Sequence, residues 1–237
     1  MDSSRAVVAI DGPSGSGKSS TSRGVALALG LDYLDTGAMY RAMAWYMLER
    51  RVDTADPAAI ALLVDQPTLV SATDPDAPTI SVDGVDVSDP IRGEEVTGAV
   101  SPVAAVPEVR SRLVDLQREV VRRSAARGRG IVVEGRDIGT VVLPEATAKI
   151  FLTADAEARA ARRALEDAGR TGDAAPAAGD IAATAASLAA RDAIDSGRAV
   201  APLRRADGAV EVDGTYLTLD EVIDTIVAIV KQACARS

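Results

Sequence analysis

Short apolar runs alternate with segments of helical periodicity over residues 7–50. Residues 7–11 form an apolar run that is typical of a buried strand. Residues 18–29 then carry apolar side chains at helical spacing, and Gly30 follows as a stop. A second strand is predicted at 31–35 and a second helix at 39–50. This order of strand, helix, strand and helix predicts a parallel sheet that binds ligands at the carboxyl ends of its strands.

The pattern changes between residues 52 and 102, where prolines and aspartates become frequent. Apolar and polar residues alternate over 79–87 around the dipeptide Asp83-Gly84, which is a hairpin signal. Because a hairpin is antiparallel, it interrupts the parallel series. We therefore predict an inserted subdomain rather than another layer of the main sheet.

A long amphipathic helix follows, with apolar residues at steps of three and four over 106–120. Gly128 and Gly130 end this segment. Two further buried strands are predicted at 131–134 and 149–153.

Helices are predicted at 155–167 and 181–197, on either side of a stretch rich in glycine, alanine and proline at 169–179. We expect this region to act as a mobile lid. A short strand at 210–212 suits the edge or end of the sheet. The final helix is predicted at 219–234, and Thr218 with Glu221 forms a capping box at its start.

The composition limits the kinds of protein that this chain can be. Its 237 residues contain 26 Lys and Arg against 35 Asp and Glu, for a formal net charge of −9. We therefore expect no nucleic-acid polymer as a partner, and a local positive site for a small anion. The chain has no histidine and a single cysteine, Cys234, which excludes histidine bases, Cys/His zinc sites and internal disulfides. No signal-peptide pattern or membrane-spanning run occurs, so we expect a cytoplasmic protein.

Residues 12–19, GPSGSGKS, fit the phosphate-loop pattern G-x-x-x-x-G-K-[ST] between a predicted strand and a predicted helix. The glycines let backbone N–H groups converge on an anion, and the helix start adds partial positive charge. Lys18 would reach the β- and γ-phosphates of ATP, and the Ser19 hydroxyl would coordinate Mg²⁺. The alternative is a glycine-rich turn that binds nothing. The residues predicted to bind the nucleotide are Gly12, Pro13, Ser14, Gly15, Ser16, Gly17, Lys18, Ser19 and Ser20.

Missing motifs narrow the choice among nucleotide-binding proteins. The chain contains no asparagine, so the Asn-Lys-x-Asp motif that reads guanine in GTPase switches is absent. The Ser-Gly-Gly signature of transporter ATPases is absent as well. A compact kinase-like enzyme with an insert and an arginine-rich lid remains.

A more specific pattern is carried by four stretches, residues 10–18, 34–41, 134–142 and 198–203. As an ordered set they resemble the bacterial cytidylate kinases (CMP kinases) of the nucleoside monophosphate kinase group. The resemblance implies phosphoryl transfer from MgATP to CMP or dCMP, giving CDP or dCDP and ADP. It also implies an α/β P-loop kinase fold, whose central parallel sheet is flanked by helices and carries an NMP-binding insert with a β-hairpin and a helical lid.

This interpretation divides the chain into five parts. They are the first part of the core at 1–51, the NMP-binding insert at 52–102, the second part of the core at 103–154, the lid at 155–180 and the C-terminal part of the core at 181–237. We expect a monomer. Two alternatives stay open: a kinase for another small acceptor, such as a different nucleotide or shikimate, and a non-catalytic nucleotide-binding module or switch.

Phosphoryl transfer depends on positioning and charge neutralisation, so the absence of histidine is no obstacle. With the resemblance, the catalytic residues are Lys18, Arg136, Arg159, Arg162 and Arg163. The last three are spaced by three and four on the predicted lid helix, which puts them on one face. Alternatively, these arginines pair on a solvated helix with acidic residues four positions away, namely Asp155, Glu166 and Asp167.

The resemblance assigns the acceptor nucleotide to a second set of residues. This set is Thr36, Arg41, Ser101, Arg110, Asp137, Arg191, Asp195 and Arg198. The last three stand at i, i+4 and i+7, and the resemblance puts Arg191 and Asp195 at the sugar and Arg198 nearer the base. The alternative is an ion-pair ladder along the helix.

Cytosine has an amino donor where uracil has an acceptor, so a carboxylate favours cytosine. The resemblance implies that Asp137 faces this amino group while Arg110 donates to the ring acceptors, with Ser101 also at the base. The alternative is an ordinary ion pair of Arg110 and Asp137 between a helix and a loop.

Overall fold

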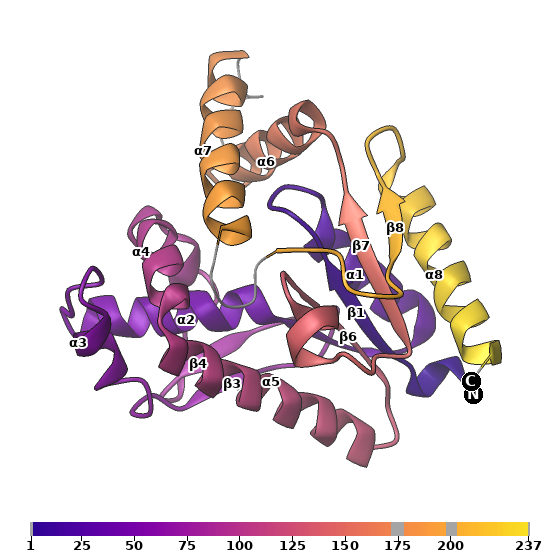
Figure 1. Ribbon diagram of the computed structural model, residues 1–237, viewed down its shortest axis with the longest axis horizontal. Helices are drawn as coiled ribbons and strands as arrows, with labels where there is room; N and C mark the ends of the chain where they lie inside the picture. The colour runs from indigo at the N-terminus through magenta and orange to yellow at the C-terminus, as the bar shows by residue number, and fades with distance from the viewer. Residues whose placement is uncertain (1, 172–177, 198–202, 237) are drawn as a thin grey trace.

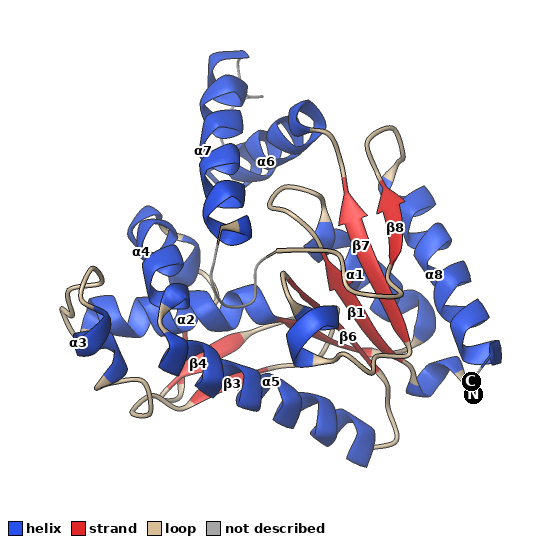
Figure 2. Ribbon diagram, viewed as in Figure 1, coloured by secondary structure: helices blue, strands red, loops and turns tan. Residues whose placement is uncertain are grey.

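The structure is a computed structural model that describes residues 2–171, 178–197 and 203–236. Its main sheet has five parallel strands in the order β2-β6-β1-β7-β8 (Figures 1 and 2). The strands are β1 (Val7–Asp11), β2 (Asp32–Asp35), β6 (Ile131–Gly135), β7 (Ala148–Thr153) and β8 (Val210–Asp213). The predicted parallel sheet is therefore confirmed, and β8 lies at its edge.

Helices cover both faces of this sheet because its strands carry apolar side chains on both sides. On one face, Val8 and Ile10 pack with α1 (Lys18–Leu29) and α8 (Leu219–Arg236). On the other face, Ala9 packs with α2 (Thr36–Glu49), α4 (Glu94–Ala105) and α5 (Pro107–Ala126). The continuous apolar runs of β1 and β6 follow from this double burial.

Helix boundaries depend on capping groups. Gly30 takes φ 65° after α1, as the stop signal predicted. Helix α2 begins at Thr36, three residues before the predicted start, because the Asp35 carboxylate accepts the Ala38 N–H at 2.9 Å. The predicted capping box of α8 is confirmed: the Thr218 N–H donates to the Glu221 carboxylate at 2.8 Å. Helix α8 continues to Arg236.

The segment from Val52 onward forms a small antiparallel sheet with short helices around it. The sheet has the order β3-β4-β5, with β3 at Leu69–Ser71, β4 at Ile80–Val82 and β5 at Val85–Asp86. Asp83 and Gly84 take φ values of 51° and 82°, which confirms the predicted hairpin turn. The short helices of this segment are α3 (Pro57–Ala61) and η2 (Pro90–Arg92). Another short helix, η1 (Ser3–Arg5), lies at the start of the chain.

Helix α4 was not predicted, and it runs through the boundary expected after residue 102. Gly98 and Pro102 disfavour a helix in the sequence. Packing against α2 overrides this preference, since Val96, Val100 and Val103 are buried in the core beside α2.

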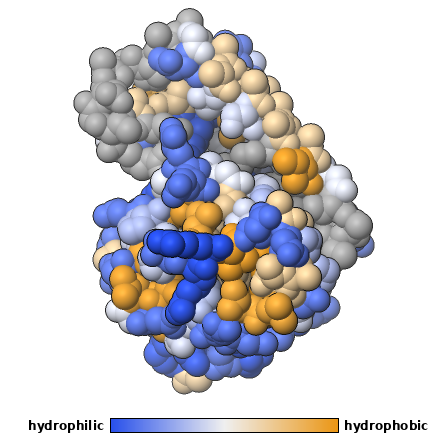
Figure 3. Space-filling view, turned by 90° about the vertical axis from the view of Figure 1, so that its left-hand side faces the viewer, coloured by the Kyte–Doolittle hydropathy of each residue, from blue (hydrophilic) through white to orange (hydrophobic). Residues whose placement is uncertain are grey.

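Figure 3 shows the side of the molecule on which α3 and α4 lie. Apolar side chains gather there among polar ones.

Helices α6 (Ala156–Thr171) and α7 (Ala178–Ser196) pack against each other beyond the carboxyl ends of the main strands (Figure 1). The helices predicted at 155–167 and 181–197 are both present, and α6 extends past the predicted end at 167. The centre of the predicted lid stretch, 172–177, lies outside the described residues. Within the part of the chain that the structure describes, no helix has the length and apolar character needed to span a membrane.

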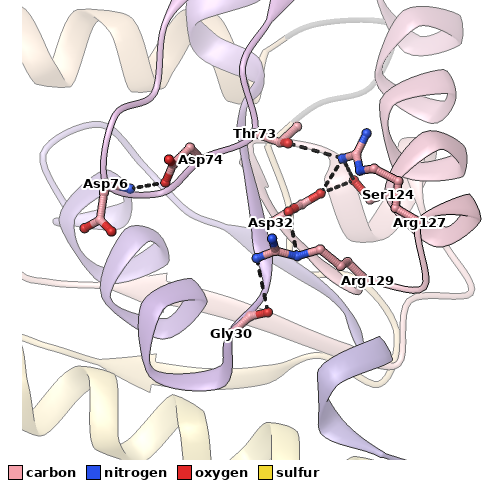
Figure 4. A network of polar contacts seen from close by, with 8 residues as sticks. All are labelled: Gly30, Asp32, Thr73, Asp74, Asp76, Ser124, Arg127 and Arg129. Carbon is pink, nitrogen blue, oxygen red and sulfur yellow. Dashed lines mark hydrogen bonds and ion pairs between the residues drawn. The ribbon is translucent and has the colours of Figure 1, made fainter.

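A polar network at the amino ends of the strands joins β2 to the connection between α5 and β6 (Figure 4). The buried Asp32 carboxylate accepts the Ser124 hydroxyl at 2.7 Å and pairs with Arg127 at 2.6 Å and Arg129 at 3.1 Å. Arg127 also donates to the Thr73 hydroxyl at 3.4 Å. This network lies at the opposite end of the strands from the phosphate loop, so we read it as structural.

Candidate active site

A cavity of about 230 Å³ lies at the carboxyl ends of β1, β2 and β6. Its walls come from the phosphate loop, the start of α2, the residues after β6, and parts of α4, α5 and α6. The sequence-predicted residues that line it are Ser14, Gly15, Gly17, Lys18, Ser19, Ser20, Thr36, Arg41, Ser101, Arg110, Arg136, Asp137 and Arg163. Predicted nucleotide and acceptor residues thus meet in one cavity.

The phosphate loop has the backbone that its glycines allow. Gly17 takes φ 86° immediately before α1, in the left-handed region that glycine adopts without strain. A Cβ on Gly15 would lie 2.9 Å from the Arg159 carbonyl oxygen, so only glycine allows α6 to approach here. Gly12, Pro13 and Ser16 complete the loop and do not line the cavity.

Lys18 lies under this loop and is 7% exposed. Its ammonium donates to the Pro13 carbonyl at 2.7 Å. Burial and the nearby Arg136 guanidinium lower the pKa of Lys18 to about 7, against the opposing effect of the Glu134 carboxylate. A bound phosphate would favour the charged form of Lys18 and raise its pKa, so the ammonium group would gain its full positive charge when an anion binds.

Glu134, to which no role was assigned from the sequence, connects three hydroxyl groups at the end of β6. Its carboxylate accepts the Ser19 hydroxyl at 3.1 Å and the Tyr33 hydroxyl on the other oxygen. Its backbone carbonyl accepts the Thr36 hydroxyl at 2.7 Å. Burial and the Asp35 carboxylate raise the pKa of Glu134 to about 7.

Tyr33 was predicted only as a core residue, and it is buried at 2% exposure. One signal could have revealed its second role: in the β2–β6 pairing, Tyr33 lies opposite Val132 and Asp35 opposite Glu134. Tyr33 and Glu134 therefore share a face of the sheet. The sequence alone does not show that β2 and β6 are neighbours.

The donor set around Ser19 fits Mg²⁺. The Ser19 hydroxyl and the Glu134 carboxylate are hard oxygen donors. Among the described residues, no group of three or more Asp, Glu, His or Cys side chains could hold a metal. Phosphate and water oxygens would have to supply the remaining ligands, as is usual for Mg²⁺.

Asp11, at the end of β1, holds the segment that carries Arg136 and Asp137. Its carboxylate accepts the N–H groups of Ile138 and Gly139, each at 2.8 Å. These N–H groups open η3 (Ile138–Val142), a single π-helical turn. Burial raises the pKa of Asp11 to about 6, against these two hydrogen bonds. From the sequence, Asp11 is predicted only as part of the strand, with no contact to this turn.

Arg110 and Asp137 form an ion pair with side-chain exposures of 7% and 6%. The Arg110 guanidinium also lies 5.7 Å from the centre of the Tyr40 ring. The ion pair that was the alternative to base reading is therefore present, and both groups line the cavity. A role in reading the base stays a prediction.

Arg41, on α2, also lines the cavity. It donates to the Thr97 hydroxyl at 3.0 Å and to the Ile91 carbonyl at 3.3 Å. These contacts join α2 to η2 and α4. They hold η2 and α4 of the inserted segment beside the cavity.

The three lid arginines have three different environments. Arg163 lines the cavity and lies 3.6 Å from the Glu166 carboxylate. Arg162 donates to the Gly214 carbonyl at 2.5 Å, after β8, and does not line the cavity. Arg159 donates to the Ser14 carbonyl at 3.0 Å and pairs with Asp192. The alternative pairing of Arg159 with Asp155 is not seen, because the Asp155 carboxylate accepts the Ala158 N–H instead.

The predicted acceptor residues near the end of α7 are only partly described. Arg191 and Asp195 lie in α7, but their side chains are outside the described part of the structure. Arg198 lies outside the described residues altogether. Their proposed contacts with the sugar and base stay predictions.

A phosphate loop between a strand and a helix, with arginines converging at the strand ends, defines the class of P-loop kinases. Sequence comparison then gives the family. The model of the family described as cytidylate kinase matches residues 8–232, so the chain belongs to the cytidylate kinase family.

The relatives agree with this assignment. A cytidylate kinase of Streptomyces avermitilis is 55% identical over 226 residues, which cover 95% of this chain and 93% of that protein. A cytidylate kinase of Streptomyces griseus is 57% identical over 228 residues, covering 96% and 94%. A gluconokinase structure from Sinorhizobium meliloti covers 97% of this chain and 93% of its own at 16% identity, with a TM-score of 0.43. At that distance, neither its fold nor its substrate transfers to this chain.

Proposed function

We propose that this chain transfers the γ-phosphoryl group of MgATP to CMP or dCMP, giving CDP or dCDP and ADP. Membership of the cytidylate kinase family supports this proposal. The observation that carries it is the shared cavity: Lys18 and Ser19 of the phosphate loop line the same space as the buried Arg110 and Asp137 pair. Donor and acceptor nucleotides can therefore meet end to end.

In the donor half, the backbone N–H groups of the phosphate loop and the Lys18 ammonium would hold the β- and γ-phosphates. Mg²⁺, when bound at the Ser19 hydroxyl, would supply positive charge to the phosphate oxygens. Glu134 accepts the hydrogen of that hydroxyl and so turns the oxygen lone pairs toward the cavity. Tyr33 fixes the other carboxylate oxygen of Glu134.

In the acceptor half, Arg41 and Arg136 would bind the phosphate of CMP, since both are guanidinium groups on the cavity wall. Asp137 would accept the amino group of cytosine, and Arg110 would donate to the ring acceptors. The proposed domain division assigns residues 52–102 to acceptor binding and residues 155–180, which include α6 and only the start of α7, to the lid. Thr36 and Ser101 would add hydroxyl contacts, and Arg191, Asp195 and Arg198 would complete the site.

The transition state of phosphoryl transfer spreads negative charge over the transferred group, so arginines rather than a strong base do the catalytic work. Arg136 and Arg163 already line the cavity where this charge develops. Arg159, on α6, donates a hydrogen bond to the phosphate loop at the Ser14 carbonyl. Closure of α6 and α7 over the nucleotides would exclude water, which would otherwise hydrolyse ATP.

The same proposal includes a monomer that works in the cytoplasm, where ATP and free nucleoside monophosphates are available.

A panel of acceptors tests the proposal. ADP release is measured with MgATP and CMP, dCMP, UMP, AMP or shikimate. We expect turnover with CMP and dCMP well above the other three. Turnover limited to another acceptor would support a different small-molecule kinase, and ATP binding without acceptor-dependent ADP release would support a non-catalytic module.

A further inference from the structure

Asp192 lies on α7, next to the predicted Arg191, and had no role assigned from the sequence. Its two carboxylate oxygens have different partners. One accepts the backbone N–H of Ser14 at 3.3 Å, and the other pairs with the Arg159 guanidinium. The same terminal nitrogen of Arg159 donates to the Ser14 carbonyl at 3.0 Å. Asp192, Arg159 and the Ser14 backbone thus form a closed set of contacts, which we call the lid bridge.

The lid bridge connects both lid helices to the phosphate loop at one point. Arg159 belongs to α6 and Asp192 to α7, whereas Ser14 belongs to the loop. The helices also pack directly on the neighbouring Gly15, where an added Cβ would lie 3.2 Å from Leu188 of α7. The position of the lid and the orientation of Arg159 are therefore set together.

Arg159 depends on this carboxylate for its orientation. Its side chain is 13% exposed, and its Nε is buried without a hydrogen-bond partner among the described residues. The hydrogen bonds of the guanidinium described in the structure go to Ser14 and Asp192 through one terminal nitrogen. A long flexible side chain held at one end needs a partner that fixes its plane, and a carboxylate is the natural one.

We propose that Asp192 is a positioning residue for phosphoryl transfer: it holds Arg159 against the phosphate loop and ties α7 to Ser14, so that the lid closes with this arginine in place. The inference rests on the proposed function and deepens it. A carboxylate beside a phosphate site would repel the nucleotide if it were alone, but here its charge is neutralised by Arg159. Asp192 therefore acts through that arginine rather than on the substrate.

A double-mutant cycle tests this role. Because small misplacements of a positioned group cost up to about 100-fold in rate, we expect Asp192→Ala to lower kcat by about 10- to 100-fold with little change in the KM for CMP. If Asp192 acts through Arg159, the double variant Asp192→Ala/Arg159→Ala loses no more activity than Arg159→Ala alone. Additive losses, an unchanged kcat, or a loss confined to the KM for CMP would overturn the proposal.

Two further variants separate positioning from folding. Asp192→Asn keeps an acceptor for the Ser14 N–H but loses the charge that pairs with Arg159, so its kcat should fall between wild type and Asp192→Ala. Glu157→Ala removes an exposed carboxylate from the first turn of α6 and should leave kcat unchanged. Thermal unfolding of each variant shows whether it is folded at the assay temperature. If Asp192→Ala is unfolded there, the cycle is run with Asp192→Asn.

A spectroscopic measurement tests the contact without catalysis. In protein labelled with ¹⁵N-serine, Asp192→Ala should shift the Ser14 amide resonance, and Glu157→Ala should not. An unshifted Ser14 resonance would contradict the lid bridge. If the wild-type chain phosphorylates another acceptor instead of CMP, the proposed function fails alone and the cycle is measured with that acceptor. If it phosphorylates none of the acceptors, both proposals fail.

Discussion

Replacing Asp137 by asparagine should change both the base preference and the stability of this kinase. The Asp137 side chain is 6% exposed and its described partner is Arg110, itself 7% exposed. Asparagine keeps the shape but removes the charge, and its amide can present either a donor or an acceptor to the base. The carboxylate's preference for the amino group of cytosine over the carbonyl of uracil is therefore lost.

The size of the effect follows from the hydrogen bond involved. A buried hydrogen bond to a charged group contributes about 1.5–3 kcal/mol, and about 1.4 kcal/mol corresponds to a factor of ten. The ratio of kcat/KM for CMP over UMP should therefore fall by about 10- to 100-fold. Arg110 is also left buried without its counter-charge, which costs up to about 3–5 kcal/mol of unfolding free energy.

The assay measures ADP release with CMP and with UMP, alongside a urea unfolding curve. Asp32→Asn is the matched control, because Asp32 is also a buried carboxylate paired with arginines but lies at the other end of the strands (Figure 4). It should lose stability and keep the CMP/UMP ratio. If Asp137→Asn likewise loses stability while its CMP/UMP ratio stays unchanged, the pair is an ordinary ion pair and our account of base reading is wrong.

Three other results are expected. Lys18→Ala should lower kcat by more than about 100-fold in the same ADP assay, because a preorganised charge next to the phosphates is lost; near-normal turnover would remove the phosphate-loop assignment. Burial lowers the pKa of Lys18 to about 7 and phosphate favours its ammonium form, so MgATP binding at pH 8 should take up a proton and weaken as the pH rises from 7 to 9. Calorimetry in two buffers of different ionisation enthalpy measures this uptake, and no uptake would contradict it. Tyr33→Phe removes a hydrogen bond that lowers the pKa of Glu134, so the acid-side loss of activity should move to higher pH and half-saturation should need more Mg²⁺; unchanged pH and Mg²⁺ profiles would leave Tyr33 as a core residue only.

The sequence pattern was sufficient for most elements because burial and capping are local. The apolar runs of β1 and β6 reflect strands covered on both faces, and the Asp83-Gly84 turn needs the positive φ values that the structure has. Helix α4 was missed because local propensity at Gly98 and Pro102 opposes it, and tertiary contacts, those with α2 above all, stabilise it. Propensity is a weak guide wherever tertiary packing decides.

The site was predictable where a motif fixes the backbone and less so where side chains meet across the fold. The phosphate loop could be placed from its motif. The ion pair of Arg110 and Asp137 was only an alternative to base reading, and two of the lid arginines, Arg159 and Arg162, contact residues on other elements. Spacing along one helix gives a shared face, but it does not say that Gly214 or Asp192 lies within reach. The Tyr33 contact to Glu134 likewise depends on the order of strands in the sheet, which local pattern does not contain.

A crystal structure with CMP and a non-hydrolysable ATP analogue tests the central claim most directly, because it shows where both nucleotides bind. We expect the triphosphate on the phosphate loop beside Lys18, the cytosine amino group on the Asp137 carboxylate, and the phosphate of CMP between Arg41 and Arg136. Electron density for CMP away from Asp137 and Arg110, or with its phosphate pointing away from the phosphate loop, would contradict the account.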